Sequence, residues 1–398
     1  MSTNVRIRNN KSAYYLGIIS CCIFVLSEYC PWLQILDQFH LKHMLLIIYV
    51  GIFGRDLIVN RKHIYIKYEM KQIILAGSIL YIISLLFQFK NGELKSYSIG
   101  EVYYLLAPLV LVGILYNYVS IKKMHNIIDA LFYTTCVSFV IRFAGSFSIA
   151  ALKQISFVDS ASPFESDMAQ FFLLYCFFYF YTNQKTKAIF SIILCFLCFK
   201  RFTLVMLAIL LLTFKFIPHH KKVPKIIWLL VVIGFILAPF AVYMMCSNEF
   251  ARWFYLQFGI DFNYFTMTRF EIINTVIDAK LTNFGLGTVT NYLEQRGYAG
   301  QLNMHNDILR IYMECTIIGT IVFTTQYFKI VKDNIYSFLV MLYAFMELFV
   351  AHYIGPGTTS FWIIAYIIIF YLNLLENMKN ENERQIINKR KRKIKIIY

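Results

Sequence analysis

The chain has 398 residues, of which 59% are hydrophobic, and it carries a formal net charge of +16. A soluble domain does not need so much apolar surface, and segments of about 20 mostly apolar residues, long enough to cross a bilayer, recur throughout. The basic residues fall in short loops and in the tail 376–398, a distribution typical of membrane proteins rather than of a nucleic-acid-binding surface. Composition therefore predicts one integral membrane domain, residues 1–398, which lies in a lipid bilayer and has no nucleic-acid partner.

Each apolar segment is predicted to be an α-helix, because backbone N–H and C=O groups inside a bilayer must be satisfied within the chain. About twelve transmembrane helices are expected, which makes the fold class an all-α polytopic membrane protein. In chain order they fall near residues 13–30, 40–54, 72–89, 99–117, 126–147, 167–182, 187–200, 202–217, 226–246, 307–328, 335–353 and 358–375.

Charge predicts how these helices are oriented. Placing the N-terminus, with Arg6, Arg8 and Lys11, in the cytoplasm puts most of the other Lys and Arg residues in cytoplasmic loops. An even number of crossings then returns the basic tail, which includes the run Lys389–Lys395, to the cytoplasm, where it lies against anionic headgroups. Both termini are therefore expected to be cytoplasmic.

Two segments on the outer side are longer than connecting turns. One lies near 148–166, and the other lies near 247–306, between the ninth and tenth helices. The second contains amphipathic stretches, of which 269–281 places Phe270, Ile273 and Ile277 on one helical face. We expect short helices on the outer membrane face, followed by a turn at the Gly-Leu-Gly sequence of residues 285–287.

Nine cysteines are present, and nearly all of them lie inside the apolar segments. Cys195 and Cys198 form a CxxC pair, but no histidine or second CxxC lies nearby, so we expect them to act as small packing residues. The sequence shows no metal site, and no cofactor is predicted. No internal repeat is apparent, which counts against a transporter.

His305 directly precedes the tenth predicted helix, and either Asn306 or Asn303 is a candidate N-cap for that helix. The positive end of a helix dipole favours the neutral imidazole, which is the form that a general base needs near pH 7. His305 is therefore a candidate catalytic base, and the alternative is an interfacial histidine without a catalytic role.

Arg310 and Glu314 are four residues apart and share a helix face with Asn306. An intramembrane arginine usually faces a partner or a wet cavity, so these three residues are candidates for substrate binding. The alternative for Arg310 and Glu314 is a structural ion pair.

Four cations are predicted to lie near the outer face, where positive charge is disfavoured: Arg142, Lys200, Arg201 and Arg269. Arginine side chains suit phosphate oxygens, so this set could bind a lipid pyrophosphate. The alternative for any one of them is contact with lipid headgroups.

Other polar residues fall in or near the apolar segments. Glu347 and His352 lie in the eleventh predicted helix and Glu101 in the fourth, and His352 could face the same cavity as His305. Glu165 and Asp167 in the shorter outer loop are alternative bases. We rank His352 below His305 because no motif surrounds it.

Two motifs resemble one known family. The pattern TR-x-E-I, then FGLG, then HNDILRIYMECTIIG, over residues 268–319, is similar to the C-terminal signature of the Wzy-type O-antigen polymerase and O-antigen ligase superfamily. The segment FKRFTLVMLAILLL, over residues 199–212, resembles its second signature, a basic residue and Thr at the start of a span. Departures are Cys315, where the family has Gly, and the Lys200-to-Thr203 form of the second motif.

The resemblance implies a GT-C-like membrane fold and a glycan donor carried on undecaprenyl pyrophosphate. His305 would match the family histidine that activates the acceptor hydroxyl, and Arg201 and Arg269 would match the pyrophosphate-binding arginines. The departure at the second motif leaves open whether Lys200 or Arg201 is the phosphate cation.

The function expected from this resemblance is a metal-independent, inverting glycosyltransferase of the bacterial plasma membrane. It would join lipid-linked repeat units into O-antigen, capsular polysaccharide or exopolysaccharide, with a flippase and a chain-length regulator as partner proteins. A ligase that moves finished polymer to another acceptor would share these motifs. A flippase for lipid-linked glycans remains the alternative from a different class.

Overall fold

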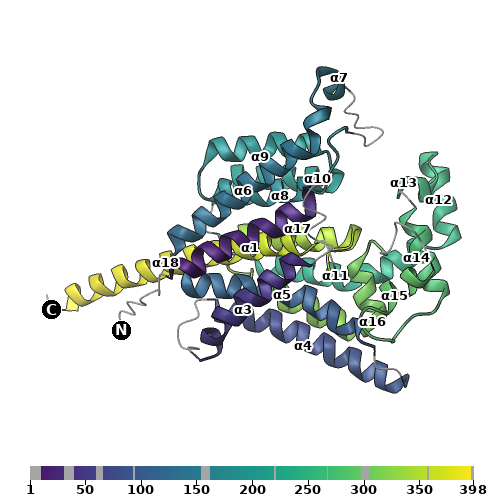
Figure 1. Cartoon of the computed structure of the whole chain (residues 1–398), viewed down its shortest axis with the longest axis horizontal. Coiled ribbons are helices and arrows are strands. Elements are labelled where there is room, and N and C mark those ends of the chain that lie inside the picture. Colours follow the sequence, from purple (N-terminus) through teal and green to yellow (C-terminus); the bar gives the residue numbers. More distant parts are fainter. Residues whose placement is uncertain are drawn as a thin grey trace.

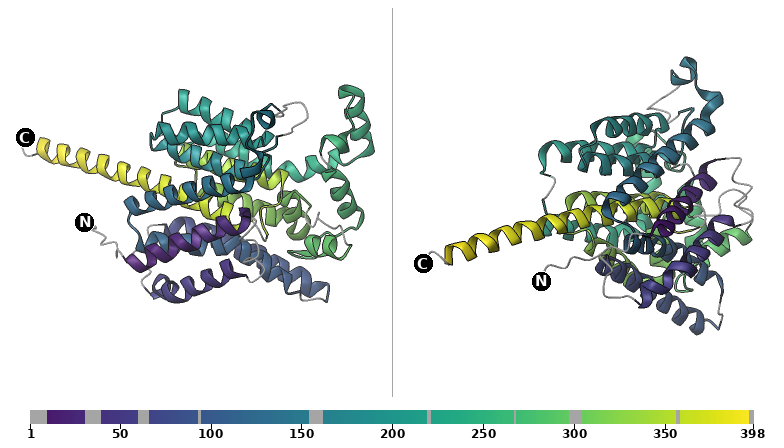
Figure 2. Two further views of the ribbon diagram at one scale, coloured as in Figure 1. Left: turned by 45° about the horizontal axis from the view of Figure 1, so that its top comes forward. Right: turned by 60° about the vertical axis from the view of Figure 1, so that its left-hand side comes forward.

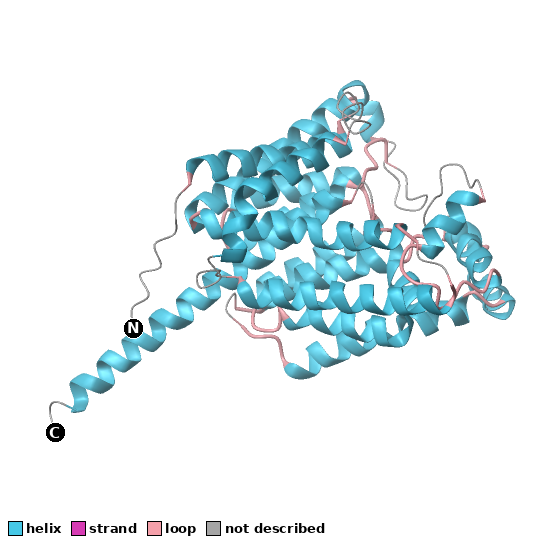
Figure 3. Cartoon of the chain, turned by 60° about the horizontal axis from the view of Figure 1, so that its bottom comes forward, coloured by secondary structure: helices cyan, strands magenta, loops and turns pink. Residues whose placement is uncertain are grey.

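A computed structural model describes residues 10–30, 40–59, 66–92, 95–153, 162–218, 221–266, 268–296, 304–355 and 358–395. These residues form helices and connecting turns, and none of them lies in a β-strand (Figures 1 and 3). The helices are α1 (Lys11–Tyr29), α3 (Leu41–Val59), α4 (Lys67–Lys90), α5 (Tyr97–Tyr118), α6 (Ile121–Phe143), η2 (Ala144–Ser146), α7 (Ile149–Leu152), α8 (Met168–Tyr181), α9 (Lys185–Cys198), α10 (Arg201–Phe216), α11 (Lys225–Met245), α12 (Asn248–Phe258), α13 (Phe262–Phe265), α14 (Arg269–Asp278), α15 (Thr288–Gln295), α16 (Asp307–Lys329), α17 (Ile335–Val350) and α18 (Thr359–Lys395).

Seven of the described helices are long and apolar enough to cross a membrane: α1, α4, α5, α6, α11, α16 and the first part of α18. This agrees with the prediction of a multi-pass helical membrane protein. The other five predicted segments are helices as well, α3, α8, α9, α10 and α17, and they have 14 to 19 residues.

The centre of the bundle is formed by helices that have no polar face. The sequence of α8, MAQFFLLYCFFYFY, is apolar all round, and twelve of its residues, Met168 to Tyr179, are buried. A helix of this kind must be surrounded by other helices, and α8 packs on α9, α18 and α17. The first part of α18 is 94% buried, so it also lies in the interior.

The outer helices expose apolar side chains instead of burying them. Only 17% of the apolar window of α11 is buried, and Leu229, Leu230 and Leu237 on this helix are exposed. Leu211 and Leu212 of α10 are exposed as well. Helices that expose so many apolar side chains are expected to face lipid.

The two ends of the bundle differ. The start of α1 and the far end of α18 lie at the same end, where α18 continues beyond the other helices as a single rod (Figures 1 and 2). Helices α12 to α15 lie at the opposite end, and α12 runs across the long helices rather than along them (Figure 1). The long segment predicted at 247–306 thus folds into four short helices where it is described.

The amphipathic pattern of residues 269–281 is realised by α14. Ile273 is buried, and Phe270 and Ile277 are partly buried, against a small core that includes Val289 of α15 and Met313 of α16. The apolar face of α14 therefore fixes this short helix on the end of the bundle.

The Gly-Leu-Gly turn lies between α14 and α15, as predicted. Gly287 has a φ of +81°, and a Cβ there would lie 2.7 Å from the Tyr97 side chain. The backbone of Leu286 donates to Ser84 Oγ at 2.8 Å and accepts from Ser98 Oγ at 2.8 Å. The turn therefore docks on α4 and α5, which the sequence did not predict.

Candidate functional site

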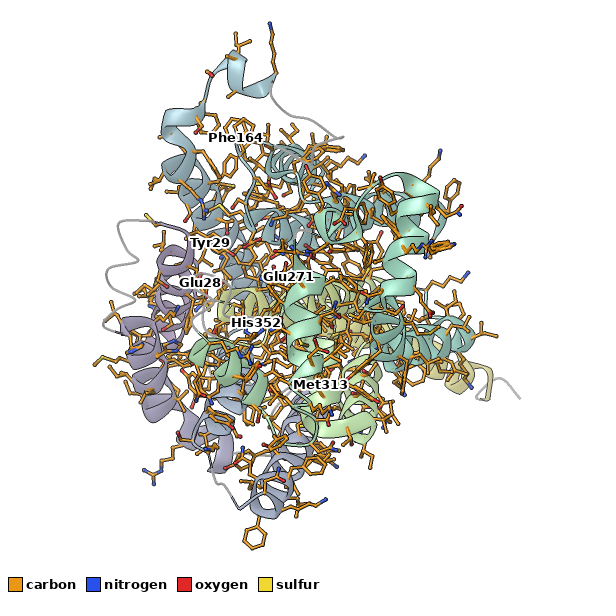
Figure 4. The ribbon with its side chains drawn as sticks, turned by 90° about the vertical axis from the view of Figure 1, so that its right-hand side faces the viewer. Glu28, Tyr29, Phe164, Glu271, Met313 and His352 are labelled. Atoms are coloured by element: carbon orange, nitrogen blue, oxygen red, sulfur yellow. The ribbon has the colours of Figure 1, made fainter. Side chains whose placement is uncertain are left out.

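A cavity of about 770 Å³ lies at the end of the bundle that α12, α13 and α14 cover. Its walls come from segments far apart in the sequence, from Tyr29 at the end of α1 to Phe361 in α18. The polar residues in its lining are Glu165, Asp167, Gln170, Lys200, Arg201, Arg269, His305, Asn306, Glu347 and His352. Figure 4 looks onto this end of the molecule and labels Tyr29 and His352.

The tight turn between α9 and α10 brings Lys200 and Arg201 to the cavity. Phe199 makes this turn with a φ of 47°, a left-handed conformation that is rare for a bulky residue. Lys200 Nζ lies 2.9 Å from Asp167 Oδ1 and 3.9 Å from Glu165 Oε1. Burial alone would lower the pKa of Lys200, but the two carboxylates outweigh it and raise the pKa above its usual value. The charge of Lys200 is thus already compensated.

Arg201 is placed differently from its neighbour. Its guanidinium lies 5.9 Å from the centre of the Phe265 ring, and no carboxylate of the described residues forms an ion pair with it. A cation over an aromatic face keeps its donors available for another anion. Of the two candidates left open by the sequence, Arg201 is therefore the better suited to bind phosphate.

Arg269 opens α14, directly after Thr268, whose φ is 61°. Its Nη1 donates a 2.7 Å hydrogen bond to the carbonyl oxygen of Val350, the last residue of α17. Burial lowers the pKa of Arg269, with the Glu347 carboxylate acting against it. An arginine remains charged under these conditions, so Arg269 brings a partly desolvated positive charge to the cavity.

His305 is half-buried and has a φ of 53°. Burial, the charge of Arg269 and the neighbouring His352 lower the pKa of His305 to about 4. The imidazole is thus neutral at pH 7, as expected from the sequence, although burial and Arg269 are the main causes rather than the helix dipole. Asn306 caps α16 by accepting a 2.8 Å hydrogen bond from the Leu309 N–H, as predicted.

Three residues with a left-handed backbone lie at these side chains or directly before them. Eight described residues other than glycine have a positive φ, and three of them are Phe199, Thr268 and His305. Phe199 and Thr268 directly precede cations that line the cavity, and His305 lines the cavity itself. Such strain persists only where the surrounding structure holds it, and it clusters at functional sites.

His352 and Asp307 form a pair that the sequence analysis missed. His352 Nδ1 lies 2.8 Å from Asp307 Oδ1, and the two side chains are 6% and 1% exposed. Asp307 follows His305 by two residues, whereas His352 lies 45 positions further along the chain. The HND sequence was the available signal, but nothing in the spacing links Asp307 to His352.

Arg310 does not line the cavity, which corrects its assignment to substrate binding. Its guanidinium is 2% exposed and forms ion pairs with Glu101 at 2.8 Å and with Asp307 at 3.0 Å. It also donates to the Ile354 carbonyl oxygen at 2.9 Å. These partners use its donors inside the protein, so Arg310 is a structural residue.

Glu314 is also away from the cavity. Its Oε1 accepts a 2.9 Å hydrogen bond from the N–H of Val289, in the first turn of α15. A carboxylate at a helix N-terminus satisfies unpaired N–H groups there. Glu314 therefore holds α15 and the Gly-Leu-Gly turn on α16, and it is not among the residues that line the cavity.

Arg142 lies in the last turn of α6, is exposed, and is not part of the cavity lining. Its guanidinium lies over the Phe143 ring, 5.7 Å from the ring centre. The structure thus places Arg142 outside the cavity lining, at an exposed position that agrees with the alternative of contact with headgroups.

Part of the cavity wall is aromatic. Phe250 and Phe254 of α12 contact Phe262 of α13, with ring centres 5.1 and 5.0 Å apart. Phe265 and Phe270 extend the same cluster. The cavity lining therefore combines three cations, three carboxylates and two imidazoles with a cluster of aromatic rings.

Comparison with known proteins does not add to this picture. The chain matches no protein-family model, and a search of curated proteins found no match. The resemblance to the polymerase and ligase superfamily therefore rests on the two sequence motifs alone.

Proposed function

We propose that this protein transfers a glycan from an undecaprenyl pyrophosphate carrier to a hydroxyl group of the next lipid-linked repeat unit, as a polysaccharide polymerase. The observation that carries the proposal is the meeting of Arg201, Arg269 and His305 in one cavity. These residues come from three separate segments of the chain. They are also the residues that the sequence motifs associate with pyrophosphate binding and with the base.

In the proposed reaction, His305 accepts the proton of the acceptor hydroxyl as its oxygen forms a bond to the anomeric carbon. The bond from that carbon to the pyrophosphate oxygen breaks, and its electron pair leaves with the pyrophosphate. Arg201 and Arg269 stabilise the charge that develops on this leaving group. Attack from the side opposite the leaving group inverts the anomeric configuration.

The proposal includes the topology. All twelve apolar segments cross the bacterial plasma membrane, both termini are cytoplasmic, and the cavity opens towards the outer face. The common end of α1 and α18, opposite α12 to α15, supports this arrangement because an even number of crossings would produce it (Figures 1 and 2). The aromatic wall supports a substrate with a lipid tail.

The test is a gel of lipid-linked and cell-surface glycans from a deletion strain complemented with His305→Asn. Asparagine tolerates the left-handed backbone of His305, so the substitution removes the imidazole without adding strain. We expect single repeat units in place of a ladder, with normal protein levels in the membrane. His40→Asn is the matched control, because His40 is exposed and also has a positive φ, 51°.

Other outcomes would contradict the proposal. A full ladder retained on the lipid carrier in the deletion strain would indicate a ligase, and repeat units confined to the cytoplasmic leaflet would indicate a flippase. Full-length polymer from the His305→Asn strain would remove His305 from the reaction.

A further inference from the structure

We infer that α12 lies in the lipid leaflet at the cavity end of the bundle, with its aromatic side towards the acyl chains, and that this lipid contact holds α12 over the cavity. Under the proposed topology this is the outer leaflet. The contact is independent of the reaction assigned to the cavity. It distinguishes α12 from α14, which lies at the same end of the bundle but packs its apolar face against protein.

The first observation is that α12 is folded by local caps rather than by burial. Ser247 Oγ accepts a 3.1 Å hydrogen bond from the Phe250 N–H at its start, and Gly259, with a φ of 67°, ends it. None of its 11 residues is buried. A helix of this length is marginal by itself in water and depends on a partner for its apolar side.

The aromatic side of α12 is wider than the cavity that it covers. Four residues recur at the spacing of one helical side: Phe250, Trp253, Phe254 and Phe258. Phe250 and Phe254 line the cavity and are partly buried. Trp253 and Phe258 do not line it, and they are 49% and 58% exposed. The outer part of this side therefore requires a second apolar partner.

The neighbouring helix indicates what that partner is. α12 packs on α11, whose exposed apolar side chains are expected to face lipid. This exposure continues to the end of α11 next to α12, where Phe240 and Met244 are 44% and 74% exposed. It resumes after α12 at Ile260 and Phe265, which are 43% and 47% exposed. The apolar surface of α12 thus adjoins a lipid-facing surface, so acyl chains are its partner.

The length of α11 sets the depth of α12. The 21 residues of α11 rise about 30 Å, which is the thickness of the hydrocarbon core. α11 ends at Met245, α12 begins at Asn248, and α12 runs across the long helices rather than along them (Figure 1). A helix with this position and direction lies at the boundary between acyl chains and headgroups.

The opposite side of α12 suits the same boundary. Asn248 and Arg252 are four residues apart and share this side, and both are exposed. An arginine here reaches the headgroups, while a tryptophan on the other side lies at the level where tryptophan is enriched. The leaflet therefore has a matching partner for each side of α12, and protein has none for the outer part of the aromatic side.

The test uses the full chain in nanodiscs of plain lipid, or of lipid brominated near the headgroup or near the chain ends. Bromine quenches tryptophan fluorescence on contact, and the difference between the wild type and Trp253→Phe isolates the Trp253 signal. We expect this signal to be largely lost with bromine near the headgroup and to be affected less by bromine near the chain ends. The signal that Trp362→Phe removes is the control, because Trp362 is 2% exposed and is expected to be unquenched in both lipids.

Two positions on α12 provide a matched pair of variants. Leu256 and Phe258 are 69% and 58% exposed, but they are two residues apart and so lie on opposite sides of the helix. We expect Phe258→Glu to abolish the quenching of Trp253 by brominated lipid and to raise its quenching by aqueous iodide, because a carboxylate is expelled from acyl chains. Leu256→Glu should change neither, and a thermal melt shows that each variant is folded.

No quenching of Trp253 by either brominated lipid would overturn the inference, and so would equal or stronger quenching from the chain ends. Equal effects of the two glutamate variants would also overturn it, because the aromatic side would then not be the side in lipid. These results leave the glycan reaction untouched, since the gel of lipid-linked glycans tests that reaction separately.

Discussion

Lys200 and Arg201 are adjacent in the sequence, but they lie in different electrostatic environments in the structure. Asp167 and Glu165 already compensate Lys200, whereas Arg201 lies over the Phe265 ring and forms no ion pair with a carboxylate in the part of the chain that the structure describes. The sequence indicated that a cation at this turn binds phosphate, but it could not choose between the two. The choice depends on the loop before α8, which packs against the turn only in the folded chain.

The two cations are expected to differ when each is replaced by alanine. In the proposed reaction Arg201 stabilises the leaving group, so we expect Arg201→Ala to lower the polymerisation rate about a hundredfold. Lys200→Ala removes a cation that is paired and partly exposed, so we expect a change within about fivefold. The measurement is a rate with purified lipid-linked repeat units.

Arg142→Ala is the control for these variants, because Arg142 is exposed and outside the cavity. Its rate is expected to match that of the wild type. A larger loss in Lys200→Ala than in Arg201→Ala would reverse the assignment of the phosphate-binding cation.

His305 predicts the pH dependence of the reaction. Because burial and Arg269 lower its pKa to about 4, the base stays neutral well below the usual histidine range. The acidic limb of kcat/KM is expected near pH 4, because only protonation of the free base removes activity on that side. Arg269→Gln removes one cause of the lowered pKa and should move this limb to higher pH.

The check is a pH profile of kcat/KM for the wild type and Arg269→Gln, both in nanodiscs. The reduced rate of the variant does not matter, since only the position of the limb is compared. An acidic limb near pH 6.5 in the wild type would be that of an unperturbed histidine. It would contradict the assignment of the base to His305, whose pKa is lowered to about 4.

At the scale of elements, helix periodicity and turn signals predicted where helices and turns form, but not which other elements they contact. The amphipathic pattern of 269–281 and the two glycines predicted α14 and the turn after it, and both are present. The same periodicity put Arg310 and Glu314 on one stripe of α16. It could not show that Arg310 meets Glu101 of α5 or that Glu314 meets α15, because those partners are set by tertiary packing.

The turn between α14 and α15 is expected to be sensitive to substitution at Gly287. Gly287→Ala would force a side chain into a left-handed backbone and bring a Cβ to 2.7 Å from Tyr97. We expect it to destabilise the protein by about 1–3 kcal/mol and to lower the apparent melting temperature. The measurement is a thermal melt of the purified variant.

Gly234→Ala is the matched control, because Gly234 lies within α11 and an added Cβ there would meet nothing within 4 Å. Alanine in a helix is expected to be neutral or slightly stabilising. A melting temperature for Gly287→Ala equal to that of the control would mean that the turn does not depend on its docking against α4 and α5.

At the scale of the whole molecule, the apolar segments were predictable because their length and hydropathy are properties of continuous sequence. Eleven of the twelve predicted ranges coincide with described helices whose ends differ by at most five residues. The twelfth range, 358–375, is wrong at its end, because α18 continues to Lys395 through most of the predicted tail. The cavity was not predictable in the same way. Its lining includes residues of α1, the loop before α8, α8, the α9–α10 turn, α11, the α12–α14 region, the residues just before α16, α17 and α18. No local pattern relates these segments to one another.

The proposed topology can be tested with reporter fusions. Alkaline phosphatase fused after Arg296, next to α15, is expected to be active because this end would lie outside the cytoplasm. A fluorescent protein fused after Pro218, between α10 and α11, is expected to fluoresce because that turn would lie in the cytoplasm. The reverse pattern would contradict the orientation, and equal signals at both sites would contradict the odd number of crossings between them.

The left-handed residues around the cavity have a practical consequence for protein engineering. Replacing Phe199 or Thr268 by glycine would relieve roughly 1–2 kcal/mol of backbone strain, more than the roughly 0.5–1 kcal/mol of extra chain entropy that glycine loses on folding. Selection for heat tolerance alone would therefore favour such replacements. The same replacements would loosen the positions of Lys200, Arg201 and Arg269, so a thermostable variant chosen without an activity assay is expected to be slow in the proposed reaction.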